Sequence, residues 1–138
     1  MQKRKVALAG LGRIGKIHLK NLTRNFPAVE VVAVMDVFDE SKGIADEYNI
    51  PVFVKDFDAL LAVDGVEVVI VCSPTDTHAD YVIQAARAGK HIFCEKPLDL
   101  DLNRVKEVLE VVKECGVQLM PGFNRRFDPE FKKIRELV

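Results

Sequence analysis

The sequence lacks an excess of either charge, a paired cysteine motif and a long apolar run. Its 138 residues include 20 Lys and Arg against 21 Asp and Glu, a formal net charge of −1. Basic residues are scattered apart from a short cluster at 3–5, so neither nucleic acid nor an acidic membrane surface is indicated as a partner. Small metabolites are the expected ligands.

The cysteines and histidines exclude further classes of site. Three cysteines without Cys-x-x-Cys spacing predict reduced, mostly buried thiols, and three dispersed histidines form no short-spaced ligand pair, so no metal site is expected. The first residues have no uninterrupted apolar stretch typical of a signal peptide, and charged residues recur throughout. These features predict a cytoplasmic protein. The residues concerned are Cys72, Cys94, Cys115, His18, His78 and His91.

The apolar pattern predicts an α/β protein. Hydrophobic residues make up 49% of the composition, enough for one globular domain that buries about two thirds of its unfolded surface. Val- and Ile-rich runs without polar alternation are separated by helix-length segments, as in a parallel sheet covered by helices on both faces. Right-handed crossovers then give a single-domain, doubly wound parallel sheet of Rossmann type with strand order 3-2-1-4-5-6. The predicted strands are 5–9, 30–35, 52–54, 67–72, 91–94 and 117–120.

Polar residues and glycines mark the helix ends. Gly89 ends a helix that begins after Thr75-Asp76, and Asp128-Pro129 begins a last helix with an apolar stripe at Phe131, Ile134, Leu137 and Val138. Asp99 and Gly116 enclose another helix. Its apolar face is expected at Leu102, Val105, Leu109 and Val112.

A glycine loop follows the first predicted strand directly and precedes a helical pattern. Gly10, Gly12 and Gly15 have the spacing Gly-x-Gly-x-x-Gly, which allows a tight turn, close approach of the backbone to a pyrophosphate, and close packing of helix on strand. The start of the helix offers free N–H groups to the phosphates. Together with Arg13 and Ile14, these glycines are predicted to bind a dinucleotide.

An acidic residue ends the second predicted strand at the distance expected for a ribose ligand. Asp36 can accept hydrogen bonds from both hydroxyls of an adenosine ribose. A carboxylate about 5 Å from a 2′-phosphate is repelled by roughly 3 kcal/mol per unit charge at an effective dielectric of about 20, so NAD is predicted over NADP. Val37 and Phe38 suit an apolar adenine slot. The alternative, a carboxylate that caps the next helix, fits Asp39 better.

The end of the fourth predicted strand is expected beside the point where open α/β sheets bind ligands. Ser73, Pro74, Thr75 and His78 are therefore candidate cofactor residues. Structural alternatives remain open: Pro74 ends the strand, Thr75 or Asp76 caps the helix, and His78 packs in its first turn. For His18, on the inward face of the first helix, a packing role is favoured.

The fifth and sixth strands end in charged residues at the same edge. Glu95-Lys96-Pro97 can place an ammonium beside a substrate hydroxyl, where it stabilises a developing alkoxide. The alternative is a solvated loop, and a cis Lys96–Pro97 bond is compatible with either. Asn124-Arg125-Arg126 can bind a polar substrate, or pair with acidic groups across a domain interface.

Taken together, these motifs resemble the glucose–fructose oxidoreductase, inositol dehydrogenase and rhizopine-catabolism (Gfo/Idh/MocA) oxidoreductases. The resemblance covers essentially the whole chain, and the last block is most similar to inositol 2-dehydrogenases. The fourth-strand loop departs from the family's frequent Thr-Pro-Asn. The matching blocks are 10–18, Asp36, 73–78, 88–91, 95–97 and 122–129.

The resemblance implies the NAD-binding half of a dehydrogenase that takes hydride from a secondary alcohol of a cyclic polyol or sugar. It implies that Lys96 is catalytic and also contacts substrate, that Glu95 and Asn124 contact the cofactor, and that Arg126 binds substrate. Family members continue into a second domain with an Asp-x-x-x-His motif that supplies the general base.

Two domain assignments follow from the resemblance. Residues 1–126 are expected to form the dinucleotide-binding domain, and 127–138 to begin a linker helix toward a substrate domain absent from this chain. The isolated chain is expected to bind NAD without completing catalysis. The alternative is a stand-alone module that senses NAD(H) or binds a partner. Exposed apolar surface favours association into a homo-oligomer.

Overall fold

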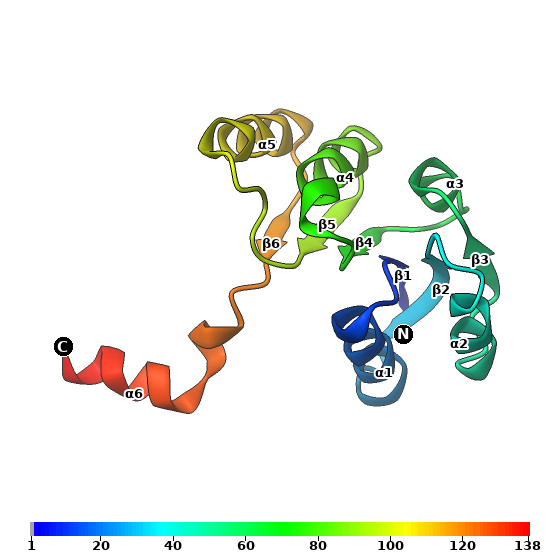
Figure 1. The fold of residues 1–138 in the computed structure, drawn as a ribbon, viewed down its shortest axis with the longest axis horizontal. Coiled ribbons are helices and arrows are strands. Elements are labelled where there is room, and N and C mark those ends of the chain that lie inside the picture. Colours follow the sequence, from blue (N-terminus) through cyan, green and yellow to red (C-terminus); the bar gives the residue numbers. More distant parts are fainter. Residues whose placement is uncertain (1) are drawn as a thin grey trace.

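Six parallel strands pair in the order β3-β2-β1-β4-β5-β6 in the computed structural model, which describes residues 2–138 (Figure 1). This is the predicted doubly wound sheet. The strands are β1 (Arg4–Ala9), β2 (Val29–Met35), β3 (Val52–Val54), β4 (Val68–Val71), β5 (His91–Cys94) and β6 (Leu119–Pro121). The helices are α1 (Arg13–Asn25), α2 (Ser41–Glu47), α3 (Phe57–Leu61), α4 (Thr75–Arg87), α5 (Leu102–Cys115), the 3₁₀ helix η1 (Asn124–Phe127) and α6 (Pro129–Leu137).

Helices cover the two faces of the sheet in separate groups. In β1, Val6 and Leu8 join the core with α1 and α2, whereas Ala7 and Ala9 join the core with α3, α4 and α5. Figure 1 shows the same division of the helices. Because both faces are buried, the central strands need apolar side chains in both directions, which explains their continuous Val and Ile runs.

The predicted strands agree with the observed ones within one residue, except at the sixth. Residues 117–118 were expected to begin that strand, but β6 begins at Leu119. The N–H of Gln118 donates to Nδ1 of His91 (3.1 Å) and so does not enter the regular ladder. The side chain of His91 therefore accepts the hydrogen bond that a backbone carbonyl oxygen would accept in a regular ladder.

Three predictions about helix ends are wrong in detail. The cap of α5 is Asp101, whose side chain accepts from the N–H of Asn103, while Asp99, two residues earlier, accepts from the N–H of Asp101. Asp39 does not cap α2, because its carboxylate pairs with Lys55. Neither Thr75 nor Asp76 caps α4, which already includes both residues. Of the expected α5 face, Leu102 and Leu109 are exposed, and the buried residues are Val108, Val111 and Val112.

The first glycine loop packs backbone directly against backbone. A Cβ on Gly15 would overlap the carbonyl oxygen of Gly10, and a Cβ on Gly10 would lie 2.7 Å from the amide nitrogen of Ser73. Gly10 also has φ +93°, which side chains rarely adopt. Glycine at these two positions therefore lets β1, α1 and the end of β4 meet backbone to backbone.

The last helix stands apart from the sheet. In Figure 1, α6 extends away from the β6 edge, and all of its residues are exposed. Asp128 caps it by accepting from the N–H groups of Glu130 and Phe131, with Pro129 in the first turn. The predicted stripe lies on this helix, apart from Val138, which follows its last residue. Within residues 2–138, no helix is long and apolar enough to cross a membrane.

The three cysteines are free and differ in exposure. Cys94 is buried, Cys72 is half-buried, and Cys115 is exposed at the end of α5, so the expectation of buried thiols holds for the first two. Burial raises the pKa of the Cys72 and Cys94 thiols to about 12, with a smaller contribution from the carboxylate of Glu95. At neutral pH both remain protonated and poorly nucleophilic.

The glycine packing predicts opposite effects of two matched alanine substitutions. Gly15→Ala should lower the free energy of unfolding by at least about 2 kcal/mol, because its methyl group meets backbone that cannot move aside. Gly43→Ala, in α2 with open space around its Cβ, should raise it by about 0.5–1 kcal/mol. Urea unfolding measures both, and equal stabilities of the two variants would contradict the packing described.

The difference in cysteine exposure predicts a single fast-reacting thiol. Native protein treated with iodoacetamide at neutral pH should take up one equivalent rapidly, at Cys115, and react at the other two sites only on unfolding. Peptide mass spectrometry identifies the modified site. Cys115→Ser should abolish the fast phase, and rapid alkylation of Cys94 would show that β5 is not buried as described.

Candidate functional site

A cavity of about 720 Å³ lies where β1, β2 and β4 end. From β1 the chain continues through α1 to β2 on one side of β1, whereas β4 pairs with β1 on its other side. The cavity therefore lies at the switch point of the sheet. Three segments that follow these strands, the first turn of α1, the start of α2 and the first two turns of α4 form the walls. The lining residues are Gly10–Ile14, Lys16, Met35–Phe38, Glu40, Ser41, Cys72–Pro74, Thr77 and Tyr81.

The glycine loop leaves the start of α1 open to this cavity. Gly12 is the N-cap residue and offers no side-chain acceptor to the first-turn amides, and nothing lies within 4 Å of the position of its Cβ. The first turn contains no acidic residue, and the side chains of Arg13 and Lys16 line the same cavity. Free amides, a positive helix end and two cations fit the pyrophosphate of a dinucleotide.

Asp36 is the buried carboxylate of the cavity, with 8% of its surface exposed. Its Oδ2 accepts from the N–H of Leu11 at 2.6 Å, and its Oδ1 accepts from the N–H of Phe38 at 3.0 Å. Each oxygen keeps a free acceptor site, so the carboxylate can also receive two ribose hydroxyls. Asp36 thus connects the glycine loop with the loop after β2.

The loop after β2 forms an apolar rim of the cavity, and the side chain of Lys55 holds this loop in place. Val37 and Phe38 are 62% and 66% exposed and line the cavity. The Nζ of Lys55 donates to the carbonyl oxygen of Val37 (2.8 Å) and to Oδ1 of Asp39 (2.6 Å). This pair of bonds holds the rim in place before any ligand arrives.

Tyr81 on α4 supplies an aromatic wall to the cavity. Its ring stacks on Phe57 of α3, with centroids 4.0 Å apart and planes 3° from parallel. Burial raises the pKa of Tyr81, and Asp76 and Asp56 raise it further, so the hydroxyl stays neutral and can donate a hydrogen bond. Flat apolar surface with a polar tip suits a nucleobase edge.

The segment after β4 is held by side chains of α4. The hydroxyls of Ser73 and Thr77 are 2.6 Å apart, and Thr77 donates to the carbonyl oxygen of Pro74 at 2.7 Å. His78 is only 2% exposed. Its Nε2 lies 2.8 Å from the carbonyl oxygen of Ser73, and its Nδ1 lies 2.7 Å from that of Pro97. Of the two alternatives for His78, the geometry supports a buried structural role.

Lys96 lies exposed at the end of β5, before a cis peptide bond to Pro97. Among the hydrogen bonds and ion pairs found within residues 2–138, none involves its ammonium group. The neighbouring Glu95 has only 22% of its side chain exposed, and its Oε1 lies 2.7 Å from Nε2 of His18 on α1. The edge of the His18 ring also packs against Phe93, with centroids 5.2 Å apart.

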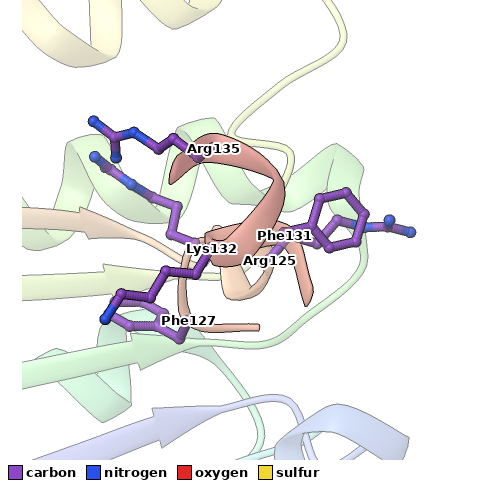
Figure 2. Close-up of a pocket in the computed structure, with 6 residues that line it drawn as sticks. Arg125, Phe127, Phe131, Lys132 and Arg135 are labelled. Atoms are coloured by element: carbon purple, nitrogen blue, oxygen red, sulfur yellow. The ribbon is translucent and has the colours of Figure 1, made fainter. Parts of the chain in front are cut away.

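Asn124 and Arg126 lie on η1, exposed, after β6. A second, cationic hollow of about 500 Å³ is formed by η1 and α6. Figure 2 shows Arg125 and Phe131 on one side of α6, where the guanidinium lies 4.7 Å from the ring centroid, and Lys132 with Phe127 on the other. This hollow shares no lining residue with the larger cavity. It is lined by Arg125, Arg126, Phe127, Phe131, Lys132 and Arg135.

The structure thus brings together most, but not all, of the predicted cofactor residues. Those that line the large cavity are Gly10, Gly12, Arg13, Ile14, Asp36, Val37, Ser73 and Pro74. The predicted cofactor residues that do not line it are Gly15, Thr75, His78, Glu95 and Asn124, and the predicted catalytic and substrate residues Lys96 and Arg126 also lie outside it. Sequence reasoning missed Lys16, Thr77 and Tyr81. The four-residue spacing of Thr77 and Tyr81 puts them on one helix face, a signal that was available once Pro74 was placed at the start of α4.

Comparison with known proteins agrees with this geometry. Residues 4–123 match a family described as an oxidoreductase family with an NAD-binding Rossmann fold. The chain is 48% identical over 132 residues to inositol 2-dehydrogenase of Rhizobium meliloti and 42% identical over 135 residues to myo-inositol 2-dehydrogenase of Thermotoga maritima. These matches cover 95% and 97% of this chain but 39% and 40% of the relatives, so the chain spans about two fifths of their length.

A solved structure with its cofactor gives the same result. Scyllo-inositol dehydrogenase from Lactobacillus casei, with bound NAD(H) and scyllo-inositol, superposes with a TM-score of 0.93 at 29% identity. The superposition covers 99% of this chain and 41% of that one. The family match, the identities and the shared fold show that this chain belongs to the Gfo/Idh/MocA oxidoreductases and is an NAD-binding Rossmann domain of that family.

Proposed function

We propose that this chain forms the cofactor half of a dehydrogenase that oxidises a secondary alcohol of a cyclic polyol such as inositol. The observation that carries the proposal is that the open helix start at Gly12 and the buried carboxylate of Asp36 share one cavity at the switch point. The names of the relatives support inositol as the substrate class.

Each part of the cavity suits one part of NAD. Asp36 would receive the adenosine ribose hydroxyls, and the amides from Gly12 to Gly15 would hold the pyrophosphate. Val37, Phe38 and Tyr81 would enclose the adenine. The carboxylate of Asp36 disfavours a 2′-phosphate in the same place, which supports NAD over NADP.

Lys96 is the proposed catalytic residue of this chain. Bound NAD would supply the acceptor for a hydride from the alcohol carbon. The ammonium of Lys96, exposed and without a partner among the described residues, can donate to the substrate hydroxyl and stabilise the developing alkoxide. Arg126 and Asn124, at the same edge of the sheet, are proposed substrate and cofactor contacts.

The described histidines leave the general base unassigned. His78 is buried, the Nε2 of His18 lies against Glu95, and His91 lies at the start of β5, the end remote from the cavity. We therefore propose that residues 1–126 are the dinucleotide-binding domain and that 127–138 begin a connection to a substrate domain. The exposed apolar side chains of α6 support this, because Phe131, Ile134 and Leu137 need a partner surface.

Replacing the proposed ribose ligand tests cofactor binding. Asp36→Ala should weaken NAD affinity by about 10- to 100-fold, the effect of losing hydrogen bonds to a charged group, and should weaken NADP affinity less. Isothermal titration calorimetry measures both. Asp46→Ala, on the exposed side of α2, is the matched control. Unchanged NAD affinity in Asp36→Ala would show that the ribose assignment is wrong.

A chimera tests the activity. We expect the 138-residue chain to bind NAD(H) without oxidising inositol, and a fusion to the remaining part of the Rhizobium meliloti relative to gain NAD-dependent oxidation, followed as NADH absorbance. Lys96→Ala in the fusion should lower kcat by about 10²- to 10⁴-fold, with Lys106→Ala on α5 as the control. Rapid inositol oxidation by the unfused chain, or full activity of Lys96→Ala, would contradict the proposal.

A further inference from the structure

We propose that His18 and His78 are positioning residues that hold the Glu95-Lys96-Pro97 turn from opposite faces of the sheet and so fix Lys96 relative to the cofactor cavity. This inference rests on the proposed function, because it assigns Lys96 a place beside the nicotinamide. It gives a role to two histidines that the proposed chemistry does not use.

His78 holds the turn from the face covered by α4. Its ring reaches across from the first turns of α4 and meets the carbonyl oxygen of Pro97 at 2.7 Å and that of Ser73 at 2.8 Å. Because carbonyl oxygens only accept, the ring donates to both when both nitrogens carry protons and to one of them when it is neutral. With both nitrogens protonated, the side chain connects the segment that follows Lys96 with a segment that lines the cavity.

His18 holds the same turn from the face covered by α1. Its Nε2 lies 2.7 Å from Oε1 of Glu95, the residue before Lys96, and its ring edge packs on Phe93 of β5. The carboxylate of Glu95 is also close to Gly122, where an added Cβ would lie 3.0 Å from its Oε2. The side chain of Glu95 is therefore enclosed between α1 and the segment after β6.

The two helices that hold the turn also form the cofactor cavity. The start of α1 provides the open amides at Gly12, and α4 follows the cavity residues Ser73 and Pro74. Lys96 itself has a long, exposed side chain without a bonded partner among residues 2–138, so its position depends on the backbone from which it extends. Each histidine thus couples a cofactor-binding helix to a residue next to Lys96: His18 joins α1 to Glu95, and His78 joins α4 to Pro97.

Packing alone does not account for the buried side chain of His78. His78 is among the largest fully buried side chains, and every other member of that group is Leu, Val or Cys. Burying an imidazole costs free energy unless its nitrogens are hydrogen-bonded. Both nitrogens of His78 meet the main chain of the two segments that flank the proposed active centre, where an apolar residue of similar volume would fill the space without connecting them.

The affinities for the two redox states of the cofactor report the position of Lys96 without any turnover. The nicotinamide ring is positively charged in NAD⁺ and neutral in NADH, so a nearby ammonium weakens NAD⁺ binding selectively. The ratio of the Kd for NAD⁺ to the Kd for NADH should therefore fall by about fivefold in Lys96→Met, the order of one unit-charge repulsion at short range in a water-like dielectric. Fluorescence titration measures NADH, and competition measures NAD⁺.

The histidine variants distinguish positioning from packing. In His18→Phe and His78→Phe the ratio of the Kd for NAD⁺ to the Kd for NADH should fall toward the Lys96→Met value. Adding either change to Lys96→Met should leave this ratio unchanged. A role in packing alone would weaken both cofactors equally and keep the wild-type ratio, which would overturn the inference. His91→Phe is the matched control, because the His91 side chain accepts from the N–H of Gln118 and lies at the opposite end of β5.

Conservative variants keep the test informative if a phenylalanine variant does not fold. His18→Gln and His78→Gln keep one donor each, so they should give ratios between wild type and Lys96→Met, with folding checked by circular dichroism. A wild-type ratio in both would overturn the inference. Lack of NAD(H) binding by the wild-type chain, or an unchanged ratio in Lys96→Met, would instead refute the proposed function and the inference with it.

Discussion

The site depends on the contact of three backbone segments at Gly10. There the end of β1 lies against the start of α1, at Gly15, and against Cys72-Ser73 at the end of β4. No side chain fits between these segments, so the helix start and the segment after β4 are held in a fixed relation. The cavity is the space that remains beside this junction, and its shape follows from the positions of the three segments.

The fold could be predicted from the sequence because one requirement, the burial of apolar side chains in the strands, recurs along the chain. Every strand except β3 and β6 lies between two neighbours and has helices over at least one face, so apolar runs of three to five residues identify them. Helix ends were harder to predict, because several acidic residues compete for one cap. Asp99 and Asp101 are both good cap residues, and only the three-dimensional path of the chain selects Asp101.

The candidate site was predictable where a motif fixes the backbone and less so where a side chain crosses between elements. The glycine loop and Asp36 follow from spacing alone, and both line the cavity. Tyr81 lines it because α3 brings Phe57 beneath its ring, a contact between residues 24 positions apart. The connections of His18 to Glu95 and of His78 to Pro97 likewise join different elements, so residue type alone could not separate a cofactor contact from a structural role.

The double use of Asp36 limits how this domain can be re-engineered for another cofactor. Its carboxylate accepts from Leu11 in the glycine loop and from Phe38 in the rim, as well as facing the cavity. A smaller neutral residue that makes room for a 2′-phosphate also removes two internal hydrogen bonds and leaves the amide of Leu11 without its acceptor. A switch to NADP therefore requires compensating changes in both loops, and the order in which they are introduced determines whether intermediate variants still fold around either nucleotide.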